Sequence, residues 1–224
     1  MTPVIAMPSS DVMPSHTLAT QLLIFPCNGN GLEALDCLGN AFQLIGFVDD
    51  TIEKQRIRVA GHPVGSRALL KERPDAKVLA VPGSSTSYKA RRSVVESLRV
   101  DLARFAQVIH PSARISPLAT IGRNVLIMAG TVITSNAVIG DHVCVLPNTV
   151  IHHDVTIGAW SLVGSNVTVA GGTRLGQNCY VGSGSNLMNG LEIGDRTLIA
   201  LGSNVIRSCP PDSRLAGNPA RPLR

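Results

Sequence analysis

From Ile109 to Val205, every sixth residue of this chain is Ile, Leu or Val, without a break. Seventeen such positions follow one another, and a small or β-branched residue usually stands four places after each, as at Ala113 and Thr131. A fixed short period sustained over this length is typical of a solenoid, in which each repeat supplies one short strand and one turn. The period therefore predicts a parallel β-helix.

The six-residue period also predicts the cross-section. One strand and one corner take six residues, so three repeats close a triangular coil of roughly 18 residues. The aliphatic residue points into the prism and stacks on its equivalent one coil away, about 4.8 Å distant. Gly, Asn and Asp at the corners, as in Ile139-Gly140-Asp141, supply unusual backbone angles. The run is long enough for between five and six coils, held together by burial of the aliphatic stack.

The overall composition suits short strands and tight turns. Charged residues make up 16% of the 224 residues, aromatic residues 3%, and there are 21 glycines. The net charge of +5 is diffuse, and no run of Lys or Arg is longer than Arg91-Arg92, so we expect no nucleic-acid partner. Since no apolar segment approaches the ~20 residues of a membrane span, we expect no membrane insertion.

The cysteines and the N-terminus bear on the compartment. The five cysteines are odd in number and their spacing fits neither a zinc motif nor a disulfide framework. We expect reduced thiols in a cytoplasmic protein. Residues 1–20 mix Pro, Ser, Thr and Met without a charged region followed by an apolar core, so we expect a disordered extension rather than a signal peptide.

Apolar strands alternate with helical stretches before the repeat begins. Strand alternating with helix predicts a small parallel sheet of Rossmann type. The expected strands are 21–25, 44–48, 77–81 and 105–109, and the expected helices are 32–38, 66–73 and 88–99. The predicted organisation is a Rossmann-like α/β domain at 21–108, a parallel β-helix at 109–208 and a C-terminal tail at 209–224.

A turn after the first strand has the pattern of a phosphate site. Gly29-x-Gly31-x-x-Ala34 fits a phosphate-binding turn at the start of a helix. Asp49 and Asp50 follow about twenty residues later at the end of the second strand, which is the spacing of a dinucleotide fingerprint. Gly83, after the third strand, either lines the same crevice or belongs to a simple turn.

Two further motifs give the repeat a family resemblance. The join Val108-Ile109-His110-Pro111-Ser112-Ala113 and the later Ile151-His152-His153-Asp154 are similar to one branch of the hexapeptide acyltransferases, which fold as a left-handed β-helix. That branch comprises bacterial sugar acetyltransferases, including UDP-4-amino-sugar N-acetyltransferases of the bacillosamine pathway, GDP-perosamine N-acetyltransferases and sialic acid O-acetyltransferases. The resemblance covers about residues 21–224. It implies an acetyl-CoA-dependent enzyme of surface glycan biosynthesis, and a homotrimer with active sites between neighbouring prisms.

The resemblance makes His153 the general base. Imidazole suits proton removal near neutral pH, and in the resembled family the acidic residue after this His supports its orientation. Here that residue is Asp154, where some relatives carry Glu. Because His153 stands two residues beyond the inward Ile151, its side chain should lie outside the prism. An exposed corner His without a task, or a role for His152 instead, are the alternatives.

The resemblance also implies a coenzyme A site. Gly171 and Gly172 fall one coil beyond His153, where missing side chains would let the thioester approach backbone N–H groups. In relatives the C-terminal ending that resembles Leu215-Ala216-Gly217-Asn218-Pro219-Ala220-Arg221 lies beside the nucleotide of coenzyme A. Gly217, Pro219 and Arg221 are therefore expected to bind acetyl-CoA. Simple corner glycines and a solvated tail are the alternatives.

In the resembled family the crevice of the α/β domain holds the nucleotide of the sugar. Relatives usually begin the first loop with Gly and carry Ser and His where this chain has Asn28 and Asn30, so UDP, dTDP and GDP all stay open. The residues expected to bind the nucleotide-linked amino sugar are Asn28, Gly29, Asn30, Gly31, Asp49, Asp50 and Gly83.

The predicted function is N-acetylation of the amino group of a nucleotide-linked amino sugar. We expect no metal, because Ser135 and Gly171 stand one coil before and after His153 and offer no histidine cluster. One alternative is a sugar or sialic acid O-acetyltransferase, with the same base and a hydroxyl acceptor. An alternative of another class is a non-catalytic nucleotide-sugar binding or scaffold protein.

Overall fold

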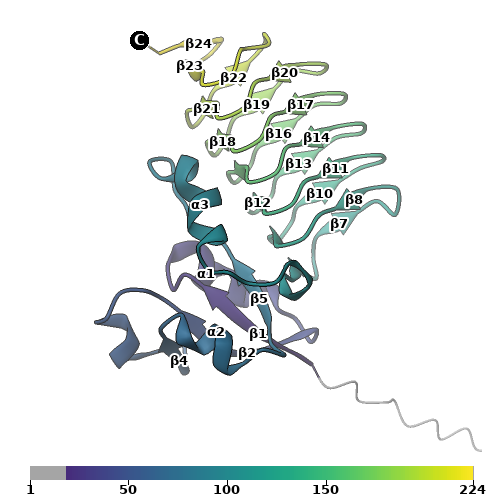
Figure 1. The fold of residues 1–224 in the computed structure, drawn as a ribbon. Helices are drawn as coiled ribbons and strands as arrows, with labels where there is room; N and C mark the ends of the chain where they lie inside the picture. Colours follow the sequence, from purple (N-terminus) through teal and green to yellow (C-terminus); the bar gives the residue numbers. More distant parts are fainter. Residues whose placement is uncertain (1–18, 224) are drawn as a thin grey trace, which may run out of the picture.

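The computed structural model describes residues 19–223. An α/β region lies beside the first coils of a long solenoid, and the C-terminus lies at the far end of that solenoid (Figure 1). The disordered extension expected over residues 1–20 lies almost entirely outside the described residues. Among residues 19–223, no helix has the length and apolar character needed to cross a membrane.

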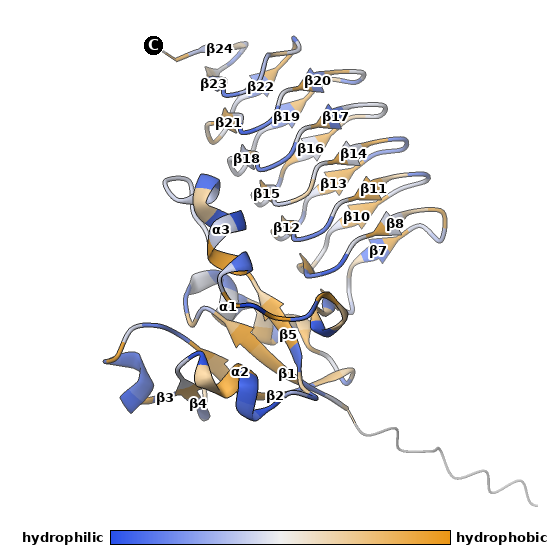
Figure 2. Cartoon of the chain, viewed as in Figure 1, coloured by the Kyte–Doolittle hydropathy of each residue, from blue (hydrophilic) through white to orange (hydrophobic). Residues whose placement is uncertain are grey.

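The α/β region is built on a five-stranded sheet of order β3-β4-β2-β1-β5. Its centre is the parallel set β1 (Thr20–Phe25), β2 (Phe42–Val48) and β5 (Lys77–Ala80), which confirms the three expected strands. Figure 2 shows the apolar colouring on these strands, as expected for parallel strands covered on both faces.

A hairpin that the sequence did not predict extends the edge of the sheet. It consists of β3 (Arg58–Val59) and β4 (His62–Gly65), and β4 pairs with β2 in parallel. Ala60 and Gly61 both have positive φ, which is the backbone of a tight two-residue hairpin turn. The two strands are too short and too polar to give an apolar run, so the sequence pattern did not predict them.

The three predicted helical stretches are present but shorter than predicted, and the 3₁₀ turns at 54–56 and 102–104 were not predicted. Several begin or end as 3₁₀ turns, and none exceeds two turns. They are α1 (Gly29–Glu33), η1 (Ala34–Cys37), η2 (Lys54–Arg56), α2 (Ala68–Glu72), η3 (Tyr88–Ala90), α3 (Arg91–Glu96) and η4 (Leu102–Arg104).

The solenoid has three faces, each a sheet of parallel strands whose residues pair with those 18 positions away. The exception is the C-terminal end of the first face, where β23 pairs with residues 16 positions before it and β24 pairs antiparallel to β23. The first face comprises β6 (Gln107–Ile109), β9 (Val125–Ile127), β12 (Cys144–Val145), β15 (Leu162–Val163), β18 (Tyr180–Val181), β21 (Leu198–Ile199), β23 (Arg214–Gly217) and β24 (Ala220–Pro222). The second face comprises β7 (Arg114–Ile115), β10 (Val132–Ile133), β13 (Val150–Ile151), β16 (Thr168–Val169), β19 (Asn186–Leu187) and β22 (Asn204–Val205). The third face comprises β8 (Thr120–Ile121), β11 (Val138–Ile139), β14 (Thr156–Ile157), β17 (Arg174–Leu175) and β20 (Glu192–Ile193). The expected fold class, a Rossmann-like α/β region followed by a left-handed parallel β-helix, is confirmed.

The interior of the prism is the aliphatic stack that the period predicted. Ile133 pairs in register with Ile151, and both are buried in the same core cluster. Buried hydroxyls in the small inward positions are also satisfied. Thr149 Oγ1 donates to the Gly164 carbonyl at 2.7 Å, and Ser161 Oγ donates to the Gly176 carbonyl at 3.0 Å. The polar inward residues therefore strengthen the coil-to-coil contacts instead of leaving buried groups unpaired.

The first face carries the α/β region. Its outward residues Leu126, Cys144 and Leu162 share one buried cluster with Leu22 and Ile24 of β1. The expected strand at 105–109 joins this face, because β6 pairs with β9, and only a single bridge from Phe105 to Val78 reaches the α/β sheet. The segment expected as a C-terminal tail likewise forms strands β23 and β24 on this face.

A buried polar cluster fastens α3 to the solenoid. The Arg91 guanidinium is completely buried and donates to three carbonyls, those of Pro82, Trp160 and His142. His142 stacks on Trp160 with a ring separation of 3.7 Å and accepts at Nδ1 from the Asn124 amide, 2.9 Å away. Asn124 in turn pairs with both backbone groups of Ala80 at the end of β5. These contacts hold the α/β region and the solenoid in one orientation.

Candidate active site

His153 and Asp154 form a hydrogen-bonded pair at the corner between the second and third faces. We call this corner, with Leu118, Asn136, Asp154, Gly172 and Gly190 at its equivalent positions, the His153 corner. The His153 side chain is 63% exposed, and Nδ1 lies 2.8 Å from Asp154 Oδ2. Because an ionised carboxylate only accepts, the neutral ring carries its proton on Nδ1 and leaves the lone pair on Nε2. The side chain is outside the prism, as predicted, and its Nε2 has no hydrogen-bond partner among the described residues.

The two glycines predicted beside His153 have different surroundings. The next coil brings Gly171 under the imidazole, where an added Cβ would lie 2.6 Å from Nε2. Gly172 donates its N–H to the His153 carbonyl, and an added Cβ there would meet no atom closer than 4.0 Å. Gly190, one coil further, faces open space. Glycine is thus required at 171 by the ring itself, whereas the corner beyond it is an open, narrow strip.

The predicted phosphate loop lies at the start of α1. The Asn28 side chain caps the helix by accepting from the Gly31 N–H at 3.2 Å. The Asn30 amide points to the carbonyls of Val81 and Gly83, at 3.3 and 3.4 Å, and so ties this loop to the one after β5. Gly31 is packed against the Pro26 carbonyl and leaves no room for a side chain, whereas Gly29 is exposed with open space around it.

The two predicted acids differ in environment. Asp49 is buried, and its carboxylate accepts from the N–H groups of Cys27 and Thr51 and from Lys54 Nζ. Burial alone would raise the pKa of Asp49, but the hydrogen bonds from Thr51 and Lys54 outweigh it and lower that pKa. Asp50 is exposed and accepts a bidentate pair from Arg67. Asp49 therefore organises the loop, and Asp50 lies on the surface beside it.

Packing against Arg91 explains why residue 83 is a glycine. Its φ is +119°, and an added Cβ would lie 2.7 Å from Cγ of the buried Arg91. The loop between Pro82 and Arg91 thus folds back on the buried guanidinium, which is why this turn needs glycine.

The predicted C-terminal residues sit on the hairpin that closes the first face. Gly217 ends β23 with φ +101°, and its N–H donates to Ser203 Oγ at 3.2 Å. Pro219 and Arg221 are exposed on the same hairpin. Gly217 lies at the end of the first-face strand β23, whereas Gly172 lies at the His153 corner. Within one chain, the two groups of predicted acetyl-CoA residues are therefore at different corners of the prism.

The structure also separates the predicted base from the predicted sugar site. The α/β loops lie on the side of the first face, and the His153 corner is the one opposite that face in a triangular prism. Within one chain, His153, Asp154, Gly171 and Gly172 come together, and so do the loops at Asn28–Gly31 and Gly83. The two groups do not meet.

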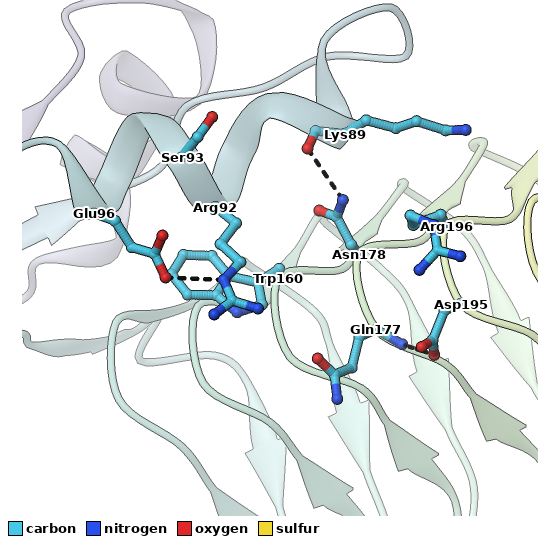
Figure 3. Close-up of a pocket in the computed structure, with 9 residues that line it drawn as sticks. All are labelled: Lys89, Arg92, Ser93, Glu96, Trp160, Gln177, Asn178, Asp195 and Arg196. Atoms are coloured by element: carbon cyan, nitrogen blue, oxygen red, sulfur yellow. Dashed lines mark hydrogen bonds and ion pairs between the residues drawn. The ribbon is translucent and has the colours of Figure 1, made fainter.

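A cavity that sequence reasoning missed lies between α3 and the corner joining the third and first faces (Figure 3). It has a volume of ≈ 290 Å³ and contains none of the predicted site residues. Its cations are already paired, Arg92 with Glu96 and both Lys89 and Arg196 with Asp212. No sequence motif marks this cavity, because its residues come from η3, α3 and three separate coils.

Two further features are the state of the cysteines and the grouping of possible metal ligands. All five cysteines are free. Within residues 19–223, no group of three or more His, Cys, Asp or Glu side chains is arranged to hold a metal ion.

Comparison with known proteins finds a family that matches the repeat and solved structures that match the fold. Residues 118–151 and 136–171 match the family described as bacterial transferase hexapeptide (six repeats). No curated protein matches the sequence. Among solved structures, a variant of perosamine N-acetyltransferase from Caulobacter crescentus, in complex with CoA and GDP-perosamine, is 25% identical with a TM-score of 0.80, over 92% of this chain and 98% of that chain.

Two further solved structures share this arrangement. The acetyltransferase domain of PglB from Neisseria gonorrhoeae, in complex with acetyl coenzyme A, is 26% identical with a TM-score of 0.80, over 92% of this chain and 100% of that chain. WeeI from Acinetobacter baumannii is 22% identical with a TM-score of 0.65 over the same shares and supports the fold. The unbroken hexapeptide repeat, the prism with its α/β region and these likenesses together show an acyltransferase with the hexapeptide-repeat, left-handed β-helix fold, similar to bacterial sugar acetyltransferases.

Proposed function

We propose that this protein transfers the acetyl group of acetyl-CoA to the amino group of a nucleotide-linked amino sugar, with His153 as general base. The observation that carries the proposal is the His153–Asp154 pair, 2.8 Å apart at an exposed corner, with Nε2 facing away from its carboxylate partner. It stands on a fold whose solved likenesses include a complex with CoA and GDP-perosamine. An amine acceptor and a thioester donor are the reactants for which a neutral imidazole base suffices.

The residues act in a simple order. Asp154 accepts from Nδ1 and keeps the lone pair on Nε2, which lies next to Gly171 of the following coil. The sugar amine attacks the thioester carbon and Nε2 takes the proton that the amine loses. The sulfur then leaves and takes this proton from the imidazolium, which yields the free thiol of CoA and returns His153 to its neutral form. One amide bond forms and one thioester bond breaks, so the reaction needs no oxidant or metal-bound water. The Asp154 carboxylate stabilises the imidazolium formed on the way.

The corner beyond His153 fits the slender pantetheine arm of the co-substrate. Gly172 and Gly190 leave an open strip of backbone next to the imidazole. The Gly171 N–H has no hydrogen-bond acceptor among the described residues, which leaves a donor for the thioester carbonyl oxygen beside Nε2. Gly217, Pro219 and Arg221 would meet the nucleotide end of the co-substrate from the C-terminal hairpin of another copy, where Arg221 offers its guanidinium to phosphate.

The sugar nucleotide would lie in the α/β region, and the site would be shared between chains. The exposed Gly29 gives a ligand close access to the backbone at the start of α1, with Asn28, Asn30 and Gly31 shaping the turn and Asp50 at its rim. Since this loop and His153 lie on opposite sides of one prism, a neighbouring copy must bring them together. A homotrimer with three equivalent interfaces does this by symmetry.

The test is acetyl-CoA turnover, followed as thiol release, with UDP-, dTDP- and GDP-linked 4-amino sugars and with free sialic acid as acceptors. We expect turnover with one of the amino sugars and a loss of about 10²- to 10⁴-fold in kcat for His153→Ala. His152→Ala is the matched control, because it removes the adjacent exposed imidazole, and its turnover should equal that of the wild type.

Three outcomes would contradict the proposal. Turnover of sialic acid alone would make the enzyme an O-acetyltransferase. Full activity of His153→Ala would remove the assigned base. The absence of turnover with every acceptor, although acetyl-CoA binds, would favour a binding or scaffold role.

A further inference from the structure

Asn136 stands one coil before Asp154 at the His153 corner. Its Nδ2 donates to Asp154 Oδ1 at 3.0 Å. Both residues have φ of 59°, so the two side chains leave the backbone in the same direction and lie one above the other. The contact is therefore built into the 18-residue register of the repeat.

The Asp154 carboxylate is held from both sides. Oδ2 accepts from His153 Nδ1, and Oδ1 accepts from Asn136. Together the imidazole and the amide lower the pKa of the Asp154 carboxyl, with His153 as the larger cause. With both oxygens engaged, the carboxylate cannot turn about its Cβ–Cγ bond without breaking a hydrogen bond.

The hydrogen bond from Asn136 to Asp154 matters because the side chains of His153 and Asp154 are exposed. Side-chain exposure is 63% for His153 and 55% for Asp154, so burial alone does not hold the Asp154 carboxylate in place. An aspartate has one methylene fewer than a glutamate, and it meets Nδ1 only over a narrow range of side-chain angles. Among the described residues, Asn136 and His153 are the carboxylate's hydrogen-bond partners.

We propose that Asn136 is a positioning residue, which fixes the Asp154 carboxylate so that Asp154 can orient the His153 base. The inference rests on the proposed role of His153 and extends it by one coil. Asn136 acts through Asp154 and has no part in proton transfer itself. The three side chains form one chain of hydrogen bonds, Asn136 to Asp154 to His153, that runs along the corner of the prism.

The turn itself does not need the asparagine side chain. Gly172 and Gly190 occupy the same corner position in later coils, with φ of +70° and +69°. Asn136→Gly is therefore compatible with the backbone and removes only the amide. Asn166 is the matched control, because it is also exposed with φ of 54° but lies at another corner, and its amide has no hydrogen bond among residues 19–223.

The first measurement compares kcat and KM for the wild type, Asn136→Gly and Asn166→Gly. We expect Asn136→Gly to lower kcat about three- to tenfold, a fraction of the effect of removing the base, with KM for acetyl-CoA unchanged. Asn166→Gly should keep the wild-type kcat, and both variants should have the same Tm. Equal kcat values for the two glycine variants would overturn the proposal.

A double-mutant cycle then separates positioning from direct contact with substrate. Asp154→Ala should lower kcat by more than Asn136→Gly does, and adding Asn136→Gly to Asp154→Ala should have no further effect. If the two losses multiply, Asn136 acts elsewhere and the proposal is wrong. A fully active His153→Ala would instead contradict the assignment of the base. An inactive His153→Ala together with an unchanged kcat for Asn136→Gly would contradict this inference alone.

Discussion

The imidazole of His153 occupies the space into which a side chain at Gly171 would project. A Cβ added to Gly171 would lie 2.6 Å from Nε2 and 2.7 Å from Cε1. The two residues are one coil apart, so the ring lies across the backbone of the next coil while Asp154 holds Nδ1 from its own coil. The position of the candidate base is thus set by a missing methyl group on one side and a carboxylate on the other.

Gly171→Ala should therefore displace the imidazole without disturbing the solenoid. The φ of Gly171 lies outside the left-handed region, so alanine fits the backbone, but its methyl group cannot share space with the ring. We expect kcat to fall at least about tenfold, because small misplacements of a catalytic group cost this much or more. Steady-state kinetics on the purified variant gives the measurement.

His153→Ala provides the control for that clash. In the His153→Ala background the space is empty, so Gly171→Ala should leave Tm unchanged, whereas in the wild type it should lower Tm slightly. A Gly171→Ala enzyme with the wild-type kcat would show that the ring does not work from the position that the structure gives it.

Much of this architecture could be read from the sequence, because its cause is local. The stack of Ile133 on Ile151 follows from a period that neighbouring coils enforce on one another. Short apolar runs likewise predicted β1, β2 and β5. The β3–β4 hairpin could not be predicted, since its strands are short and its apolar residues few. Similarly, β6 reads as an apolar strand in either region, and only its pairing with β9 assigns it to the solenoid.

The candidate site shows the same division. The spacing placed His153 outside the prism and Gly171 one coil away, and the structure brings them into contact. The sequence could not show that Asn136 reaches Asp154, because asparagine is common at left-handed corners for backbone reasons alone. Nor did it identify Arg91 as buried, since an Arg-rich helix normally faces solvent and its three acceptors are backbone carbonyls.

Arg91 should be essential for the attachment of the α/β region to the solenoid. Among residues 19–223, its completely buried guanidinium is bound by carbonyls and by no carboxylate. Arg91→Met keeps much of the volume but leaves three buried carbonyls without their donor. We expect a loss of about 3–5 kcal/mol in the free energy of unfolding, measured by chemical denaturation.

Arg92→Met is the matched control for this prediction. Arg92 is the next residue of α3, but it is exposed and pairs with Glu96 four residues on. An exposed pair of this kind contributes about 0.5 kcal/mol at most, so the control should unfold almost as the wild type does. Equal stability of the two variants would mean that the buried contacts of Arg91 add nothing to the junction.

His142 should make the protein sensitive to acid. Burial lowers the pKa of His142 from its ordinary 6.5 to about 4. Between these values the unfolded chain binds a proton that the folded chain does not, so stability is full above about pH 6.5 and falls as the pH drops towards 4. The shift corresponds to about 3 kcal/mol once the pH is below 4.

The measurement is Tm as a function of pH for the wild type and for His142→Asn. Asparagine already occupies the equivalent corner position at Asn124 and Asn178, so the variant should fold. It should be less stable at neutral pH, because the stack on Trp160 is gone, but it should lose less Tm between pH 6.5 and 4. His152→Asn, at an exposed site, should keep the wild-type slope, and an identical slope in all three proteins would contradict the assignment.

The final prediction concerns the sharing of the site between chains. Gly29→Trp should block the turn at the start of α1 without unfolding it, because a side chain at Gly29 enters open space. His153→Ala removes the base. Each variant alone should be inactive with the nucleotide-linked amino sugar, the first through its acceptor site and the second through its chemistry.

Co-assembly of the two variants should restore activity if the base of one chain serves the α/β loop of its neighbour. Random mixing leaves both halves intact at about one quarter of the sites, since each site draws its base and its loop from different chains. Purification through two different tags removes the homotrimers and leaves one intact site in each mixed trimer, so turnover should approach about one third of the wild-type value. A mixture that stays as inactive as its parents would place both halves of the site in one chain. An active Gly29→Trp homo-oligomer would instead show that the sugar nucleotide binds away from this loop.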